Sequence, residues 1–312
     1  MSPTATSRRY LVMLAVLALI WGSSFMFIKV AVRELDPATL IFGRLALATL
    51  TLAVVVAASA GFRPMLGELR VNWRPLIVVG LVNTALPFWL LSWGETRIAS
   101  GLASIIQASV PIFNAVLAFA FFRDQRVAGV QLAGITVGFV GVALLVGAQP
   151  QGKILGALAV VGMAACYGLG GLLTRRLLLG VKPPVIALGT SLAAAIAVGP
   201  LGIARAPSHL PGAGVLASIV VLGVLGTALA YLLFFTIIAG AGAAYASLVT
   251  YLVPPVALAY GALFLNESIG VAAAGGLVLI LAGVALGTRG RPTLRRSRTA
   301  VPRLAGAPSE PS

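Results

Sequence analysis

The segment Gly80-Leu-Val-Asn-Thr-Ala-Leu86 recurs 143 residues later as Gly223-Val-Leu-Gly-Thr-Ala-Leu229. Further pairs at the same offset are Ser104 with Ser247, Val110-Pro111 with Val253-Pro254, and Asp124 with Glu267. Any two sequences rich in alanine and leucine share some positions, but these pairs include prolines, hydroxyl residues and acids. We therefore interpret the chain as an internal duplication, and this duplication decides the fold.

The composition assigns the duplicated sequence to the lipid bilayer. Of 312 residues, 60% belong to the hydrophobic set AVILMFWYC and only 9% are charged, and the mean hydropathy is +1.06. A soluble domain carries about 25% charged residues, because its surface must stay hydrated. The chain is therefore predicted to be a polytopic membrane protein.

Ten apolar segments are long enough to cross the bilayer as helices, for which about 20 residues are needed. They lie at 11–32, 38–60, 75–93, 98–121, 128–147, 154–174, 184–204, 215–238, 243–265 and 270–288. Long apolar runs without two-residue alternation favour helices over β-strands. The sequence thus predicts an all-α membrane protein of ten transmembrane helices, five in each repeat.

The odd number of spans in each repeat has a consequence for orientation. Two copies of one five-helix unit must insert into the membrane in opposite directions, which makes them inverted repeats. We place the first repeat at 10–147 and the second at 148–288, flanked by a tail at 1–9 and a basic tail at 289–312. In many transporters such symmetry relates two states, each open to one side of the membrane, around a site near the midplane.

The Lys and Arg residues are unequally distributed between the two membrane faces. Sixteen of the 22 lie in the tails and in the loops on the N-terminal side, and four lie on the opposite side. By the positive-inside rule, both termini are expected in the cytoplasm. The tail at 289–312 is expected to be disordered and, like the basic loops, to contact anionic lipid headgroups.

The composition also excludes several functions. The net charge of +15 lies in short loops and the tail, so no folded basic surface is available for nucleic acid. The single cysteine, Cys166, excludes an intramolecular disulfide, and the single histidine, His209, lies in a predicted loop without partners for a metal. We expect no nucleic acid, no metal and no cofactor.

Several motifs together resemble a known family. The pattern Trp21-Gly-Ser-Ser-Phe25 in the first span, Arg44 in the second, and the duplicated Pro111 and Pro254 are similar to the drug/metabolite transporter superfamily. The resemblance is to its ten-helix exporters with two EamA domains. It implies a cell-membrane carrier that exports amino acids or related small metabolites without ATP. The chain has no Walker-type Gly-x-x-x-x-Gly-Lys-Ser/Thr loop, which agrees.

Polar residues within the spans identify a candidate substrate path, because they are costly to expose to lipid. On the span 98–121, Ser104, Gln107, Pro111 and Asn114 recur at intervals of three or four and share one helical face. The residues predicted to line the path are Trp21, Ser24, Arg44, Asn83, Thr84, Trp89, Ser104, Gln107, Asn114, Tyr167, Thr227, Tyr231, Ser247 and Thr250. Small and hydroxyl residues also join packed membrane helices, so packing is the alternative role for each of the small and hydroxyl members.

Three prolines and one arginine each have two interpretations. Pro87, Pro111 and Pro254 remove helical hydrogen bonds and are either hinges or static kinks. Arg44 is the most deeply placed basic residue of the spans. It either binds a substrate carboxylate or pairs with Glu95 at the end of the third span.

The residues also bear on the mechanism and on competing functions. No Asp or Glu lies near the middle of a predicted span, so facilitated export or exchange fits better than coupling through a buried acid. A nucleotide-sugar or phosphate-ester carrier would need several buried cations. A membrane-embedded transferase would need a histidine, a carboxylate pair or a metal cluster at an interface. A scaffold without transport is disfavoured only by the repeated polar positions.

Two glycine motifs permit close helix contacts. They are Gly134-x-x-x-Gly138 in the fifth span and Gly283-x-x-x-Gly287 in the tenth. Such motifs join helices within a monomer or across a dimer. The predicted partners are therefore a small-molecule solute and lipid, with the protein either a monomer or a homodimer.

Overall fold

The computed structural model describes residues 3–121, 129–268 and 270–288. Asp124 and the basic tail at 289–312, expected to be disordered, lie outside these ranges. Within them the chain is helical, without β-strands. The first half of the chain contains α1 (Pro3–Ala31), α2 (Pro37–Ala60), α3 (Phe62–Val71), α4 (Trp73–Gly80), η1 (Leu81–Ala85), α5 (Leu86–Glu95), α6 (Ser100–Gln107), α7 (Val110–Phe121) and α8 (Val130–Gly147). The second contains α9 (Gln151–Leu177), α10 (Pro183–Ala204), α11 (Ala213–Val220), η2 (Val221–Leu229), α12 (Ala230–Ala241), α13 (Ala243–Ala246), α14 (Val249–Leu265) and α15 (Val271–Thr288).

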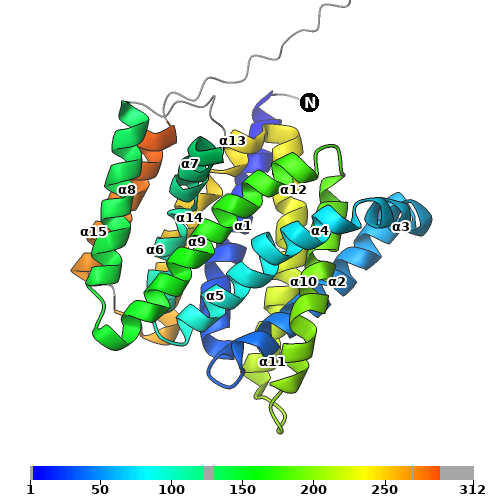
Figure 1. Ribbon diagram of the computed structural model, residues 1–312, viewed down its shortest axis with the longest axis horizontal. Helices are drawn as coiled ribbons and strands as arrows, with labels where there is room; N and C mark the ends of the chain where they lie inside the picture. Colours follow the sequence, from blue (N-terminus) through cyan, green and yellow to red (C-terminus); the bar gives the residue numbers. More distant parts are fainter. Residues whose placement is uncertain (1–2, 122–128, 269, 289–312) are drawn as a thin grey trace, which may run out of the picture.

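These elements form a bundle of membrane-spanning length. Eight stretches are long and apolar enough to cross a bilayer, and two shorter apolar helices lie at Val249–Leu265 and Val271–Leu286. The prediction of an all-α membrane protein of about ten helices is confirmed. The first turns of α1 and the last turns of α15 lie at the same end of the bundle (Figure 1). We call this the proximal end, and the opposite end, where α1 ends and α6 begins, the distal end.

The two halves of the chain interlock instead of forming separate bodies. The helix α1 runs from the proximal to the distal end, whereas α9, the first helix of the second half, runs back from the distal end (Figure 1). The most extensive helix pairs each join one half to the other: α8 with α15, α2 with α10, and α1 with α14. The main buried cluster therefore contains residues of both halves.

The pair formed by α8 and α15 explains the glycine motifs. A Cβ atom added at Gly283 would lie 2.6 Å from the carbonyl oxygen of Gly134 and from the Cα atom of Gly138. Only a residue without a side chain permits this approach. Gly134, Gly138 and Gly283 thus join two helices within one chain.

Four spans are less regular than the sequence predicted. The third and eighth spans widen into the π-helical segments η1 and η2, which overlap the repeated Gly80–Leu86 and Gly223–Leu229 segments. The fourth and ninth spans are broken, between α6 and α7 and between α13 and α14. The π-helical turns are single local insertions that apolar periodicity does not reveal. The segment that contains α3 is treated as a loop in the sequence analysis, whereas the structure forms a helix in which Met65 is buried and Phe62 and Leu66 are exposed.

Candidate functional site: an internal cavity

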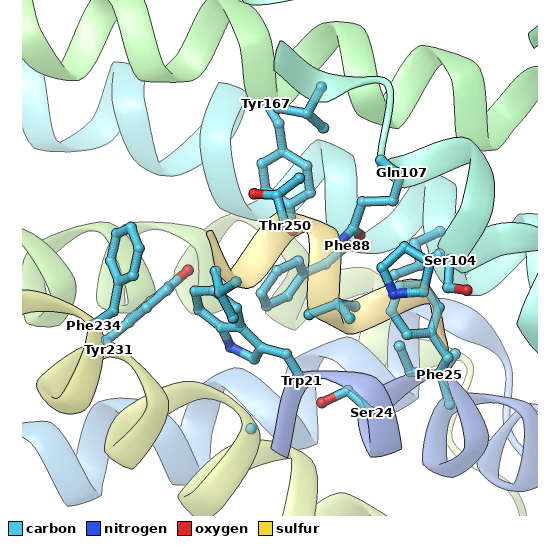
Figure 2. A pocket seen from close by; sticks show the side chains of 18 of the residues that line it. Trp21, Ser24, Phe25, Phe88, Ser104, Gln107, Tyr167, Tyr231, Phe234 and Thr250 are labelled. Carbon is cyan, nitrogen blue, oxygen red and sulfur yellow. The ribbon is translucent and has the colours of Figure 1, made fainter. Parts of the chain in front are cut away.

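A cavity of about 320 Å³ lies inside the bundle, between helices of both halves (Figure 2). Ten of the sequence-predicted residues line it: Trp21, Ser24, Arg44, Asn83, Ser104, Gln107, Tyr167, Tyr231, Thr250 and Pro254. They come from α1, α2, η1, α6, α9, α12 and α14. Residues from opposite ends of the sequence therefore meet around one space, as a midplane site requires.

A second cavity, of about 220 Å³, adjoins the first. The two share Val110 and Thr250 as lining residues. The second is also lined by Pro111, Asn114 and Ser247, which places three further predicted residues together. Since α7 runs from Val110 toward the proximal end, the second cavity continues the first in that direction.

Four predicted residues line neither cavity. Thr84 is 1% exposed within η1, and Pro87 is buried in the first turn of α5. Trp89 stacks against Trp93 with ring centroids 6.2 Å apart. Thr227 is fully buried in η2 and accepts a hydrogen bond from the cavity residue Arg44. Thr227 therefore lies behind the wall and holds one of its members in place.

Arg44 carries the formal charge of the cavity wall. Its side chain is only 6% exposed, its Nε donates to Thr227 Oγ1 at 2.9 Å, and its guanidinium carbon lies 3.9 Å from the ring centroid of Phe88. Among the described residues no acidic side chain forms an ion pair with it, so the alternative of an Arg44–Glu95 pair is wrong. The terminal nitrogens of the guanidinium group make no hydrogen bond to a described residue, which leaves a planar pair of donors for an anion.

Aromatic and aliphatic side chains make up much of the remaining wall. The rings of Trp21 and Phe234 lie 5.4 Å apart, and Phe25, Phe88 and Leu91 complete the apolar lining. The sequence prediction missed Phe25, Phe88, Leu91 and Phe234, because an apolar residue within an apolar span carries no signal that separates a cavity wall from a lipid-facing surface. Among the aromatic residues, the sequence therefore predicts only Trp and Tyr, which carry a polar atom, as lining residues.

Two prolines remove the helical hydrogen-bond donors of residues that line the cavity. Proline has no N–H, so Pro111 leaves the carbonyl of Gln107 without its helical donor, and Pro254 does the same for Thr250. Gln107 and Thr250 are equivalent in the duplication and both line the cavity. The chain breaks directly after Gln107, whereas α14 continues through Pro254. Each repeat thus contributes a polar residue whose carbonyl lacks its usual partner.

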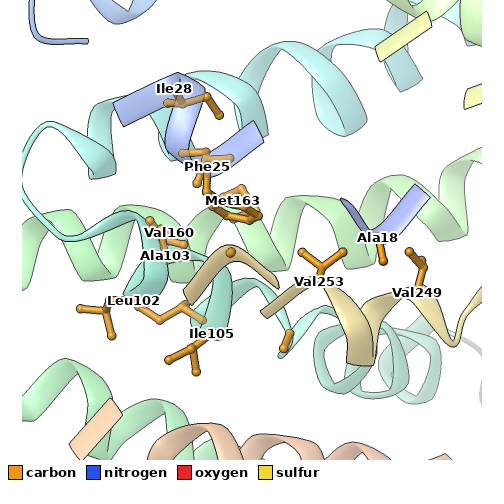
Figure 3. Packing of buried hydrophobic residues seen from close by; sticks show 14 of the residues in the cluster. Ala18, Phe25, Ile28, Leu102, Ala103, Ile105, Val160, Met163, Val249 and Val253 are labelled. Atoms are coloured by element: carbon orange, nitrogen blue, oxygen red, sulfur yellow. The ribbon is translucent and has the colours of Figure 1, made fainter. Parts of the chain in front are cut away.

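The distal side of the cavity is closed by close-packed apolar side chains. Phe25, Ile28 and Val253 line the cavity and also belong to the main buried cluster. In the same cluster, Leu102 and Met163 precede the cavity residues of α6 and α9, which both begin at the distal end. Figure 3 shows how Leu102 and Met163 pack with their apolar neighbours. A solute in the cavity therefore has no path through the distal half in this conformation.

The sequence profile of the EamA-like transporter family matches residues 8–147 and 154–289. The chain belongs to the EamA-like transporter family. A transporter from Archaeoglobus fulgidus is 27% identical over 90% of this chain and 99% of its own length. A protein of Streptantibioticus cattleyicolor named "probable terminal-alkyne amino-acid exporter" is 31% identical over 90% of this chain and 93% of its own length.

A solved structure has the same fold. This crystal structure superimposes on the chain with a TM-score of 0.64 at 20% sequence identity. The superposition covers 90% of this chain and 97% of the other chain. The family match and these relatives identify a multi-pass membrane transporter.

Proposed function

We propose that the protein exports amino acids, or closely related small zwitterions, across the cell membrane by ATP-independent alternating access. The observation that carries the proposal is the unpaired guanidinium group of Arg44 in the wall of a largely apolar cavity. In the proposed orientation the proximal end faces the cytoplasm. The conformation described here, closed at the distal end, would be the one that receives solute from inside the cell.

The lining offers complementary partners for the three parts of an amino acid. The carboxylate would bind the free edge of Arg44, where a planar fork matches two carboxylate oxygens. The ammonium group would bind the carbonyl groups of Gln107 and Thr250, which Pro111 and Pro254 deprive of their helical donors. The side chain would lie against the aromatic wall that contains Trp21.

The size and charge of the cavity agree with this class of solute. A volume of about 320 Å³ is at the lower end of the range of ligand pockets, roughly 300–1,000 Å³, and suits one small molecule. A nucleotide sugar carries more negative charge than one arginine neutralises. Aromatic rings with a polar atom, such as Tyr167 and Tyr231, accept both apolar and polar side chains.

The inverted repeats would supply the motion. In the proposal the segments 10–147 and 148–288 exchange conformations, so that the packing that closes the distal end is formed next at the proximal end. The prolines of the fourth and ninth spans lie beside the cavity in both halves. They are the points at which α7 and α14 would bend during this exchange.

The test is efflux of labelled amino acids from liposomes that contain the purified protein. A neutral amino acid, the amine lacking its carboxylate and the keto acid lacking its ammonium group are compared as competitors. We expect only the intact zwitterion to compete, because removal of either group leaves a buried protein partner unpaired. A site built to hydrogen-bond a group discriminates by orders of magnitude against an analogue that lacks the group.

Arg44 variants connect the flux to the cavity. Arg44→Met should abolish competition by amino acids, and Arg44→Lys should retain only a small part because it lacks the planar fork. The matched control is Arg97→Met, which removes a guanidinium group that lies 3.6 Å from the Trp93 ring centroid and outside the cavity. Equal flux in Arg44→Met and wild type, or flux of the amine without the zwitterion, would refute the proposal.

A further inference from the structure

Two carboxyl groups and one ammonium group gather at the distal end, beyond the apolar closure. Glu95 ends α5, Glu267 follows α14, and Lys29 lies in the last turn of α1. All three surround the turn that connects α5 to α6. This turn joins the first-repeat helices whose side chains close the cavity, so its contacts bear on whether the distal end can open.

Glu267 is fully engaged. Its carboxylate accepts hydrogen bonds from the backbone N–H of Ser100 at 2.8 Å, the backbone N–H of Gly101 at 3.0 Å and the hydroxyl of Ser100 at 2.9 Å. Three donors at the start of a helix stabilise a negative charge. Glu267 therefore caps α6 as a carboxylate and joins the second half of the chain to the first.

Glu95 has the opposite environment. Its side chain is fully buried, and neither carboxyl oxygen has a hydrogen-bond partner. The nearby Lys29 donates instead to the backbone carbonyls of Glu95 and Ile98, at 2.6 and 2.8 Å. A charged carboxylate without a donor is far more costly to bury than a neutral carboxyl group.

We propose that Glu95 is a proton-binding site: it is protonated while the distal end is closed and gives its proton to water when that end opens. The step breaks the O–H bond of the Glu95 carboxyl group and forms a hydrated proton at the distal face. Opening separates α1 from the turn between α5 and α6. Lys29 then loses its two carbonyl acceptors, and water reaches the Glu95 carboxyl group.

The groups around Glu95 are consistent with this assignment. The charged groups that face Glu95 are Lys29 on α1, Arg44 on α2 and Glu267 after α14. Neither cation forms an ion pair with Glu95 in the described part of the chain. The helix α9 presents Gly156 and Val160 where it meets α5, and α6 presents the Ser100 hydroxyl, which Glu267 already engages.

The proposal makes the equilibrium between the open and closed states depend on pH. Because the closed state binds one proton more than the open state, acid at the distal face favours closure and alkali favours opening. Between the two limits the ratio of open to closed protein changes about tenfold per pH unit. The inference rests on the alternating access of the proposed function but not on the identity of the solute.

Cysteine labelling without solute measures this equilibrium directly. Cys166 is replaced by Ala, and Leu102→Cys places a thiol in the distal closure, where the wild-type side chain is 8% exposed. Its labelling rate in detergent micelles is followed from pH 5.5 to 8.5. Each rate is divided by that of Leu210→Cys, whose position is 83% exposed, because thiol ionisation alone also changes the rate with pH.

The normalised rate should rise up to tenfold per pH unit in the parent protein. Glu95→Gln cannot ionise, so its rate should stay low and independent of pH, whereas Glu95→Asp should retain the dependence with a displaced midpoint. The Asp variant and a monodisperse elution profile guard against misfolding of the Gln variant. A rate in the parent that does not change with pH, or a pH dependence that survives in Glu95→Gln, would overturn the inference. Failure of amino-acid transport alone would leave the labelling result standing.

Discussion

Replacement of Glu267 by Ala is predicted to weaken the distal end more than any other single change to its loops. The substitution removes the acceptor of three hydrogen bonds, at 2.8, 2.9 and 3.0 Å. Ser100, whose backbone N–H and hydroxyl are two of the donors, is fully buried. Loss of a helix cap costs about 0.5–2 kcal/mol, and loss of a negative charge at a helix start about 0.3–1 kcal/mol.

The backbone N–H and the hydroxyl of Ser100 lose their acceptor in this variant, which adds to the loss of stability. A buried donor left unsatisfied costs about 1–3 kcal/mol, but this cost partly repeats the cap contribution. The expected loss for Glu267→Ala is therefore about 2–4 kcal/mol in the free energy of unfolding. Glu267→Gln, which retains one oxygen acceptor, should lose about half of this. Ser100→Ala removes a single hydroxyl and should lose about 1 kcal/mol.

Denaturant unfolding of the purified variants in micelles measures these free energies. The matched control is Glu34→Ala, because Glu34 also accepts a backbone N–H bond at the distal end, from Gly212 at 2.9 Å, but at an exposed site. The control should change stability by about 0.5 kcal/mol or less. If Glu267→Ala unfolds with the free energy of the control, the cap is not a stabilising contact and the reasoning is refuted.

Three further changes test the cavity and the packing of the bundle. Thr227→Val should lower amino-acid efflux at low concentration about five- to fifty-fold while expression stays normal, because Arg44 loses its anchor; wild-type efflux would contradict this role. Gly283→Leu should prevent α15 from packing on α8 and abolish a monodisperse elution profile, whereas Gly147→Leu, with open space around it, should not. Pro111→Ala should restore the helical donor for the Gln107 carbonyl and slow efflux with unchanged stability or a gain; unchanged efflux would show that the break is incidental.

Much of the fold could be predicted from the sequence because the bilayer imposes a simple length and composition rule. The apolar segments at 38–60 and 184–204 correspond to α2 and α10 to within one residue. The end of α2 at Gly61 follows from a backbone φ of 85°, which a glycine adopts without strain. Segment length, composition and single glycines therefore suffice to predict the bounds of these two membrane-spanning helices.

The irregular spans could not be predicted, because their shape depends on tertiary contacts. The π-helical turn at Leu81–Ala85 contains Asn83, which lines the cavity. Hydrophobic periodicity does not reveal where a helix contains one inserted residue. Likewise, the sequence leaves Arg44 with two candidate partners, because position along a helix does not reveal which neighbour its side chain contacts. The neighbour is Thr227, 183 positions away.

The duplication is incomplete at the cavity, and the incompleteness bears on how a solute would be carried. Pro111 and Pro254 are equivalent, so both repeats supply a carbonyl that lacks its helical donor. Arg44 has no such counterpart. The first residues of α2 and α10, Pro37 and Pro183, are 146 positions apart, and at this offset from Arg44 stands Thr190. The Thr190 hydroxyl donates to the Ile186 carbonyl of its own helix at 2.7 Å. In the proposed exchange of conformations, an ammonium group could pass between equivalent acceptors, whereas a carboxylate would remain with α2. A carboxylate held by Arg44 would thus keep its partner throughout the cycle, and the rest of the solute would change its surroundings.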